Sequence, residues 1–177
     1  AVVDRPADQA GGAGRVVAEP ASPGYRRYAV TPTGISPMAV PGTPGTAYTA
    51  DGLEHGERGR PSSQAADHYA QLDKRKRKLD DWDYGKGWAD VEGDLAAESA
   101  VITFGSCTGP VREGMARAAG DGLSARLVSL RLLSPLQPAR LAAALAGVRR
   151  ILVVEQNHTA QLYKYLRAEC DLPGRLS

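Results

Sequence analysis

The sequence predicts an α/β protein built on a doubly wound, mostly parallel sheet. Three apolar runs, at 100–104, 125–130 and 149–155, are separated by segments long enough for crossover helices. The first and third runs are almost unbroken apolar stretches, which is typical of strands that helices cover on both faces. Because strands and helices alternate in this way, we expect parallel strands in a domain at 96–177.

Length and composition narrow the possible functions. The 177 residues suffice for one domain and an arm, and 42% hydrophobic and 24% charged residues are typical of a globular protein. A net charge of +2 and an aromatic content of 6% argue against nucleic acid as a partner. No run approaches the roughly 20 apolar residues of a membrane span, and no signal peptide is visible, so we expect a cytoplasmic protein.

The first half of the chain is predicted to form a tail and an arm. Residues 1–24 are rich in Ala, Gly, Pro and Asp, and we expect a linker or tail there. A connecting arm is expected over 25–95. Prolines and glycines alternate through its first part, so regular structure cannot persist and the segment must lie across another surface.

Two stretches of the arm have a more definite prediction. A helix is expected over 62–79, because apolar side chains recur at helical spacing and Ser62 or Ser63 can cap it. The stretch 82–93 contains three glycines and is expected to be a loop that leads into the sheet.

An acid and an imidazole lie side by side in the glycine-flanked loop at 51–59. His55 could act there as a proton carrier or a polar contact, with Glu54 or Glu57 as its partner. From the residues alone we favour the alternative, a turn that carries solvated charges, because one histidine beside acids is common. The functional interpretation stays open.

Five basic residues follow one another at 74–78, near the end of the expected helix. Such a run could be a nuclear-localisation signal or a phosphate-binding patch. We favour the alternative that these cations interact with the helix dipole and are neutralised by the acids at Asp80, Asp81 and Asp83.

The turn at 105–110 follows the first apolar run directly. Its glycines, with Ser106 and Thr108, could form an anion site at the carboxyl edge of the sheet. Thr108 could equally cap the helix expected at 111–119, in an ordinary tight turn. Cys107 has no His or Asn neighbour that would mark it as a nucleophile.

Polar side chains also follow the third apolar run. Glu155 and Asn157 stand at the carboxyl end of a parallel strand, where ligands and partner subunits bind in such folds. They could equally cap the helix expected over 160–170. Both possibilities remain open at this point.

Several short motifs occur in a fixed order between Tyr25 and Leu166. They are Arg27-Tyr28, Thr33-Gly34-Ile35-Ser36-Pro37, Pro41-Gly42, Gly52-Leu53-Glu54-His55-Gly56-Glu57-Arg58-Gly59, the basic run with Leu79, Ile102–Ser106, Leu130–Leu136 and Val154–Asn157. Together they resemble the alpha subunits of 2-oxoacid:ferredoxin oxidoreductases, especially those of the 2-oxoglutarate type. Gly56 departs from the pattern, since the family usually has Asp there.

The resemblance implies a transketolase C-terminal-like domain preceded by its connecting arm. It also implies a beta subunit that carries thiamine diphosphate, magnesium and usually an iron–sulfur cluster. Together the subunits would decarboxylate a 2-oxoacid with coenzyme A and reduce ferredoxin. The family's pyrimidine-binding domain is expected to precede this region and is not in the sequence. Tyr28–Pro32 imitates a motif of that domain but lies in the arm, so no cofactor contacts are carried over to it.

The chain alone is expected to bind no cofactor and to be inactive. Its only cysteines, Cys107 and Cys170, are far apart and cannot hold an iron–sulfur cluster alone. We expect it to serve assembly and active-site closure, with Glu54 and His55 near the substrate or a subunit interface.

Two rival interpretations remain. One is a non-catalytic module that holds a small anion between 105–109 and 155–158. The other is a transketolase or pyruvate dehydrogenase beta-type domain, which would have neither the acid–histidine loop nor the basic helix end.

Overall fold

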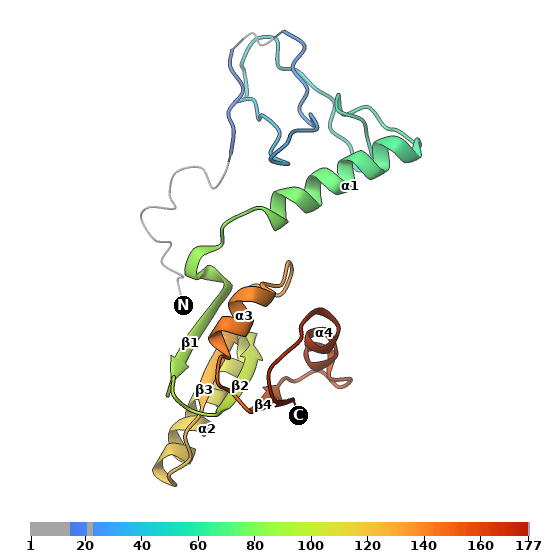
Figure 1. Ribbon diagram of the computed structural model, residues 1–177. Coiled ribbons are helices and arrows are strands. Elements are labelled where there is room, and N and C mark those ends of the chain that lie inside the picture. The colour runs from blue at the N-terminus through green and yellow to red at the C-terminus, as the bar shows by residue number, and fades with distance from the viewer. Residues whose placement is uncertain (1–14, 21–22, 177) are drawn as a thin grey trace. The chain divides into compact units, whose positions relative to one another are not determined.

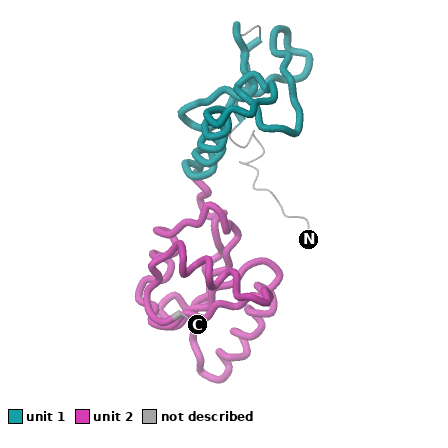
Figure 2. The backbone as a smooth tube through the Cα atoms, turned by 90° about the vertical axis from the view of Figure 1, so that its right-hand side faces the viewer, with its two compact units in different colours: residues 1–82 teal, residues 83–177 magenta. Residues whose placement is uncertain are grey.

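The computed structural model describes residues 15–20 and 23–176, which form two compact units (Figure 2). The N-terminal unit comprises Ala1–Trp82 and the C-terminal unit Asp83–Ser177. Most of the tail predicted over 1–24 lies outside the described residues. The two units meet after Trp82, whereas the sequence suggested a boundary after residue 95; the difference arises because residues 89–93 pair with the sheet.

The C-terminal unit is organised around one five-stranded sheet (Figure 1). Its strands are β1 (Ala89–Gly93), β2 (Ser99–Phe104), β3 (Arg126–Leu130), β4 (Arg150–Val154) and β5 (Arg175–Leu176), in the order β1-β3-β2-β4-β5. The strands β3, β2, β4 and β5 are parallel, and only the edge strand β1 is antiparallel. The predicted mostly parallel α/β sheet is therefore confirmed.

Helices cover both faces of this sheet, as a doubly wound fold requires. They are α2 (Thr108–Gly120), α3 (Pro138–Ala144) and α4 (Gln161–Glu169), with two short 3-10 turns, η2 (Gly85–Trp88) and η3 (Gly105–Cys107). Neighbouring residues of β2 point to opposite faces. Ile102 packs in one apolar cluster with residues of α3 and α4, whereas Val101 packs in another with Val111 of α2.

The main core lies on the α3 and α4 side of the sheet. Its largest side chains are fully buried aliphatic residues, among them Ile102, Leu141, Leu145, Ile151 and Leu166. Burying side chains of this size contributes about 1.5–3 kcal/mol each, so this cluster is the main source of stability in the C-terminal unit.

The structure corrects the loop that the sequence predicts at 82–93. Its last part is strand β1, in which Val91 pairs with Val128 in antiparallel register. The strand was hidden because Ala89 alone among its five residues is buried, so the sequence carries no apolar run.

Helix α1 (Ala65–Asp80) is the one regular helix among the described residues of the N-terminal unit. It begins later than predicted, and Gln64 rather than a serine is its N-cap residue. Ser62 nevertheless supports this end, because its hydroxyl accepts a hydrogen bond from the Gln64 N–H and donates one to Asp67.

The arm before α1 is irregular, as predicted. Its described residues form two isolated bridges, between Val17 and Met38 and between His55 and Pro61, and no continuous strand. None of the helices in the described part of the chain is long and apolar enough to cross a membrane.

Candidate functional site

The arm is attached to α1 through polar side chains of the helix. The Gln71 side-chain amide and the Lys74 ammonium group both donate to the carbonyl oxygen of Tyr28, each at 3.0 Å. Lys74 also donates to the Ser36 hydroxyl at 3.1 Å. One turn further on, Arg77 donates to the carbonyl of Thr31 at 3.1 Å. The helix therefore satisfies backbone carbonyls that the irregular arm cannot satisfy itself.

Lys74 is an unusual interior residue, since only 6% of it is exposed. Its ammonium nitrogen lies 5.8 Å from the centroid of the Tyr28 ring, in cation–π range. Burial lowers the pKa of Lys74 from 10.5 to about 8, and the nearby Arg75 and Arg27 reinforce the effect. The buried ammonium group of Lys74 therefore binds the arm, but removing this charge from water opposes the gain in free energy.

The closest approach between arm and helix occurs at Gly34, which has a φ of +73°. A Cβ atom at this position would lie 2.5 Å from the carbonyl oxygen of Lys74 and 2.6 Å from the backbone nitrogen of Lys78. Only glycine fits both the left-handed conformation and this contact.

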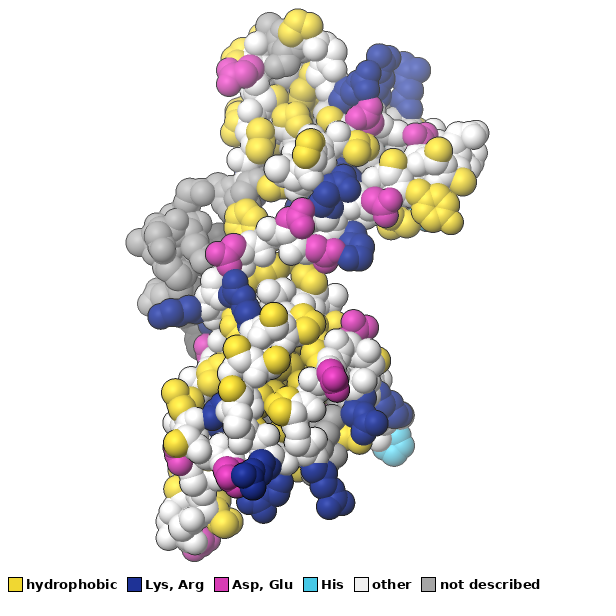
Figure 3. All heavy atoms as spheres, viewed as in Figure 1, with side chains coloured by type: hydrophobic (Ala, Val, Ile, Leu, Met, Phe, Trp, Pro, Cys, Tyr) yellow, Lys and Arg dark blue, Asp and Glu magenta, His cyan; other side chains and the backbone are white. Residues whose placement is uncertain are grey.

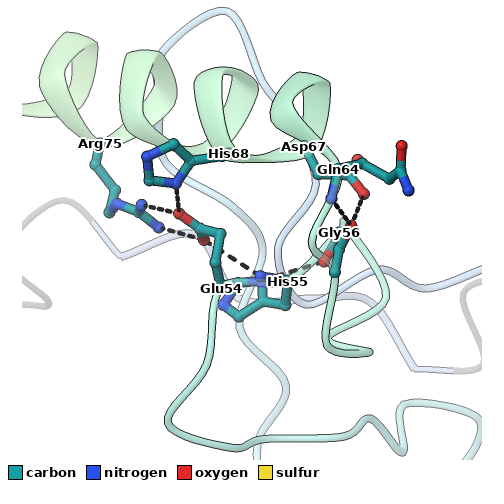
Figure 4. Close-up of polar contacts among 8 residues, drawn as sticks. Glu54, His55, Gly56, Gln64, Asp67, His68 and Arg75 are labelled. Atoms are coloured by element: carbon teal, nitrogen blue, oxygen red, sulfur yellow. Dashed lines mark hydrogen bonds and ion pairs between the residues drawn. The ribbon is translucent and has the colours of Figure 1, made fainter.

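Glu54 is the centre of a charged cluster between the loop at 51–59 and α1 (Figure 4). Arg75 donates two hydrogen bonds to its carboxylate, at 3.3 and 2.8 Å, and the Nδ1 atom of His68 lies 2.9 Å from the Oε2 atom. The His55 backbone N–H donates to the same carboxylate at 3.3 Å. This is the bidentate geometry in which an arginine–carboxylate pair is strongest.

These contacts fix the charge of Glu54. The hydrogen bonds from Arg75, opposed by burial and reinforced by His68, lower the pKa of Glu54 from 4.5 to about 2. A carboxylate that is ionised and already bound by Arg75 and His68 is a poor proton carrier near neutral pH. Its geometry instead favours a structural lock between the loop and α1.

His55 lies against the arm rather than facing α1. Its ring is 3.9 Å from that of Tyr28, centroid to centroid, and its Nδ1 atom lies 3.2 Å from the carbonyl oxygen of Gly56. The structure therefore does not pair His55 with the Glu54 carboxylate through its ring; His68 takes that place.

Glu57 fastens the other end of the same loop. Its carboxylate accepts a hydrogen bond from the Val30 N–H at 2.8 Å and forms an ion pair with Arg26. The Val30 N–H lowers the pKa of Glu57, with Arg26 reinforcing this against the opposing effect of burial. Both glutamates of the loop thus act as acceptors for groups elsewhere in the N-terminal unit.

The run at 74–78 has a further role besides the one that the sequence favours. Lys74, Arg75 and Arg77 hold the arm and its loop. Lys76 forms the expected ion pair with Asp80. Interaction with the helix dipole and the downstream acids is therefore only part of the explanation for the run.

The second predicted cluster lies at the carboxyl ends of β2 and β4. These neighbouring strands lead into helices on opposite faces, so their loops flank the switch point of the sheet. Ser106 is exposed there. Thr108 is the first residue of α2 rather than its cap, and its hydroxyl lies 2.7 Å from that of Ser129. Of the two possibilities that the sequence left open, the cap does not form: α2 has no side-chain cap hydrogen bond, and the Thr108 hydroxyl contacts the buried Ser129 on β3 instead.

Glu155 takes the capping role that the sequence left open. Its carboxylate accepts hydrogen bonds from the backbone N–H groups of Leu162 and Tyr163, both at 2.9 Å, and from the Asn157 side chain at 2.8 Å. Burial raises the pKa of Glu155, but these N–H groups outweigh it, and the pKa is lowered overall. Glu155 and Asn157 therefore complete the first turn of α4.

The side chains of α1 that bind the arm and its acid–histidine loop were not found from the sequence. Gln71 and Lys74 could have been suspected only because they share one helical face with Arg75 and Lys78. The described residues contain no group of three or more His, Cys, Asp or Glu side chains placed to hold a metal ion.

Comparison with known proteins gives this geometry a context. No protein-family profile matches the chain. The chain is 34% identical over 151 residues to subunit alpha of 2-oxoacid:ferredoxin oxidoreductase 2 from Aeropyrum pernix, a match that covers 84% of this chain and 23% of that protein. It is 32% identical over 136 residues to the 2-oxoglutarate oxidoreductase subunit KorA of Mycobacterium tuberculosis, covering 75% of this chain and 20% of that one.

A solved structure agrees with these sequence matches. The 2-oxoglutarate:ferredoxin oxidoreductase of Magnetococcus marinus, with 2-oxoglutarate, coenzyme A and succinyl-CoA bound, matches with a TM-score of 0.70 and 37% identity. The match covers 86% of this chain and 27% of that one. The chain is homologous to part of the 2-oxoacid:ferredoxin oxidoreductase alpha subunit.

The resemblance predicted from the short motifs is thus confirmed. The 2-oxoacid:ferredoxin oxidoreductase relatives are much longer, and the chain spans about a quarter of the length of the curated proteins that it matches, at 23% and 24% of the first two. The Glu54 lock and the Lys74 contacts all lie within the N-terminal unit, among residues that include the quoted motifs.

Proposed function

We propose that this chain is the C-terminal part of the alpha subunit of a thiamine diphosphate-dependent 2-oxoacid:ferredoxin oxidoreductase, with 2-oxoglutarate as substrate. The complete enzyme would convert the 2-oxoacid and coenzyme A to an acyl-CoA and reduce ferredoxin, in the cytoplasm. In this proposal the chain serves subunit assembly and active-site closure and has no activity alone.

One observation carries the assembly role: α1 buries two polar side chains while it leaves large apolar side chains exposed among its charged residues. Gln71 and Lys74 face the arm and are 1% and 6% exposed. Tyr69 and Leu72, three residues apart on another face of the helix, are 67% and 42% exposed. An isolated protein gains nothing from this arrangement, whereas an apolar helix face that docks on another part of the enzyme is stabilised by it.

The cofactors fit a partner better than they fit this chain. An iron–sulfur cluster needs about four thiolates, and the sequence has two cysteines, Cys107 and Cys170. Cys107 is buried in the sheet domain. We therefore assign thiamine diphosphate, magnesium and the cluster mainly to the beta subunit.

The experiment is co-expression of the complete alpha subunit that contains this segment with its beta subunit. The measurements are co-purification of the two subunits and viologen reduction that depends on 2-oxoglutarate and coenzyme A. The double variant Y69S/L72S should lose most of the co-purification with the beta subunit and most of the viologen reduction. Its matched control is L95S/L123S, which removes two leucines that are 60% and 67% exposed in the C-terminal unit. Equal co-purification of the two variants would refute the assembly role, and inactivity of the unaltered pair with every 2-oxoacid would refute the enzyme assignment.

A further inference from the structure

A hollow of about 390 Å³ opens on the N-terminal unit, beside the loop at 51–59 but apart from the Glu54 lock. Its lining residues are Arg26, Gly56, Glu57, Arg58, Arg60, Pro61, Ser62 and Asp67. Three arginines face two carboxylates there, so the hollow carries a net positive charge. Figure 3 shows that Lys and Arg side chains lie at several places on both units, with Asp and Glu side chains between them.

The two carboxylates of the hollow are already bound. Glu57 accepts from the Val30 N–H and pairs with Arg26, and Asp67 accepts from the Ser62 hydroxyl. In the described part of the chain, Arg26 is thus paired with a carboxylate, whereas Arg58 and Arg60 are not. Both are exposed, and their guanidinium groups take part in none of the hydrogen bonds and ion pairs found among the described residues. Two guanidinium groups at one hollow are therefore available to a ligand.

The backbone holds these two arginines in a defined turn. The Gly59 N–H donates to the carbonyl of Gly56 at 3.0 Å, and the Gly56 N–H donates to that of Arg60 at 3.3 Å. Gly59 has a φ of +81°, and a Cβ atom there would clash with the carbonyl oxygen of Thr49. The turn is thus packed against the arm, which lowers the entropy that Arg58 and Arg60 lose when they bind a common ligand.

We propose that this arginine hollow binds a phosphate-bearing small molecule. The planar guanidinium group donates two parallel hydrogen bonds to a phosphate, and two such groups complement a ligand with two or more negative charges. The volume lies within the usual range of about 300–1,000 Å³ for small-molecule sites. The proposal rests on the hollow alone, and its test is a binding measurement that does not depend on the oxidoreductase assignment.

The probes are inorganic phosphate, pyrophosphate and ADP, measured by isothermal titration calorimetry with the whole chain at low and high salt. We expect pyrophosphate to bind more tightly than phosphate, and both to weaken as salt screens the arginines. ADP binding more tightly than pyrophosphate would identify a nucleotide as the ligand class, and equal binding would identify the phosphates alone. If none of the three probes saturates the chain at concentrations up to about 10 mM, the affinity is too weak for a specific site and the proposal is overturned.

Three double variants test whether pyrophosphate binds in the hollow. R58A/R60A should weaken pyrophosphate binding by at least about tenfold, because charge-assisted hydrogen bonds are lost. R58K/R60K keeps the positive charges but loses the bidentate guanidinium geometry, so its pyrophosphate affinity should lie between those of the unaltered chain and R58A/R60A. The matched control R112A/R117A removes two positive charges from α2 and should bind as the unaltered chain does. An equal loss in the control would mean that binding follows net charge, and the proposed site would be rejected.

Discussion

The two units of this chain are stabilised in opposite ways. The C-terminal unit buries aliphatic side chains such as Ile102 and Leu141 on the faces of a sheet. The N-terminal unit instead buries Gln71 and Lys74 against an irregular arm, and leaves Tyr69 in solvent. An apolar core is non-directional and tolerates small shifts, whereas polar contacts of this kind depend on individual geometries.

The difference indicates how far each unit depends on its context. Each buried aliphatic side chain in the C-terminal unit contributes about 1.5–3 kcal/mol. Each hydrogen bond between arm and helix contributes about 0.5–1.5 kcal/mol net, or about 1.5–3 kcal/mol where Lys74 or Arg77 is the charged donor, and the desolvation of the buried Lys74 opposes this gain. The C-terminal unit therefore has its own core, and the N-terminal unit is expected to gain much of its stability from a docking partner.

The largest effect should come from breaking the apolar core. Ile102 is fully buried at the centre of β2, so I102A should destabilise the C-terminal unit by about 2–5 kcal/mol. Urea unfolding followed by the fluorescence of the buried Trp88 measures this. Leu152 on the neighbouring strand is 50% exposed, and L152A should cost about 1 kcal/mol or less. Similar losses in both variants would contradict the assigned core.

A smaller effect should come from separating the arm from α1. G34A adds a Cβ atom at 2.5 Å from the Lys74 carbonyl oxygen, on top of the roughly 1–2 kcal/mol cost of a left-handed alanine. Gly42 has a similar φ of +88° with no heavy atom near its Cβ position, so G42A isolates the backbone cost. Hydrogen exchange at the Tyr28 amide, which donates to the Glu57 carbonyl, should accelerate more in G34A. Equal rates would show that the close contact is unimportant.

The Glu54 lock should make the N-terminal unit sensitive to acid. Its pKa in the folded chain, about 2, lies below the ordinary 4.5. Stabilisation by this group is therefore present above pH 4.5 and is lost as the pH falls toward 2. Pepsin cleavage of the arm should rise over this window in the unaltered chain. E54Q should be cleaved more readily throughout and should show a smaller rise toward acid than the unaltered chain; the remaining rise would come from Glu57, whose pKa is also lowered. An unchanged acid profile in E54Q would exclude the lock.

The last expected effect concerns Lys74. Its pKa of about 8 lies below the ordinary 10.5, so the folded state loses the proton first and stability should rise as the pH increases from 8 to 10.5. Carbon-13 NMR of lysine side chains measures this titration directly. Lys76 is the control, because Asp80 raises its pKa above the ordinary value. If Lys74 titrated with Lys76, it would not be buried in solution.

Much of the fold follows from the sequence alone. The apolar runs at β2, β3 and β4 identify parallel strands, and alternating helices determine that the sheet is covered on both faces. Strand β1 was missed because an edge strand with only Ala89 buried carries no such run. Its place in the sheet depends on pairing with β3, which is a tertiary contact.

The candidate site was likewise predicted only in part. The sequence identified the loop with Glu54 and His55, since an acid and an imidazole between glycines are visible as a local pattern. Which side chains bind that loop was decided by the tertiary structure, because Arg75 and His68 lie 21 and 14 residues away. Apolar spacing that includes Tyr69 predicted the helix correctly, but Tyr69 is exposed and the arm covers the face with Lys74. The local sequence pattern therefore determines where helices and strands form. Which face of a helix an irregular arm covers depends on which donors of the folded chain bind the carbonyl groups of the arm, and this is a tertiary property.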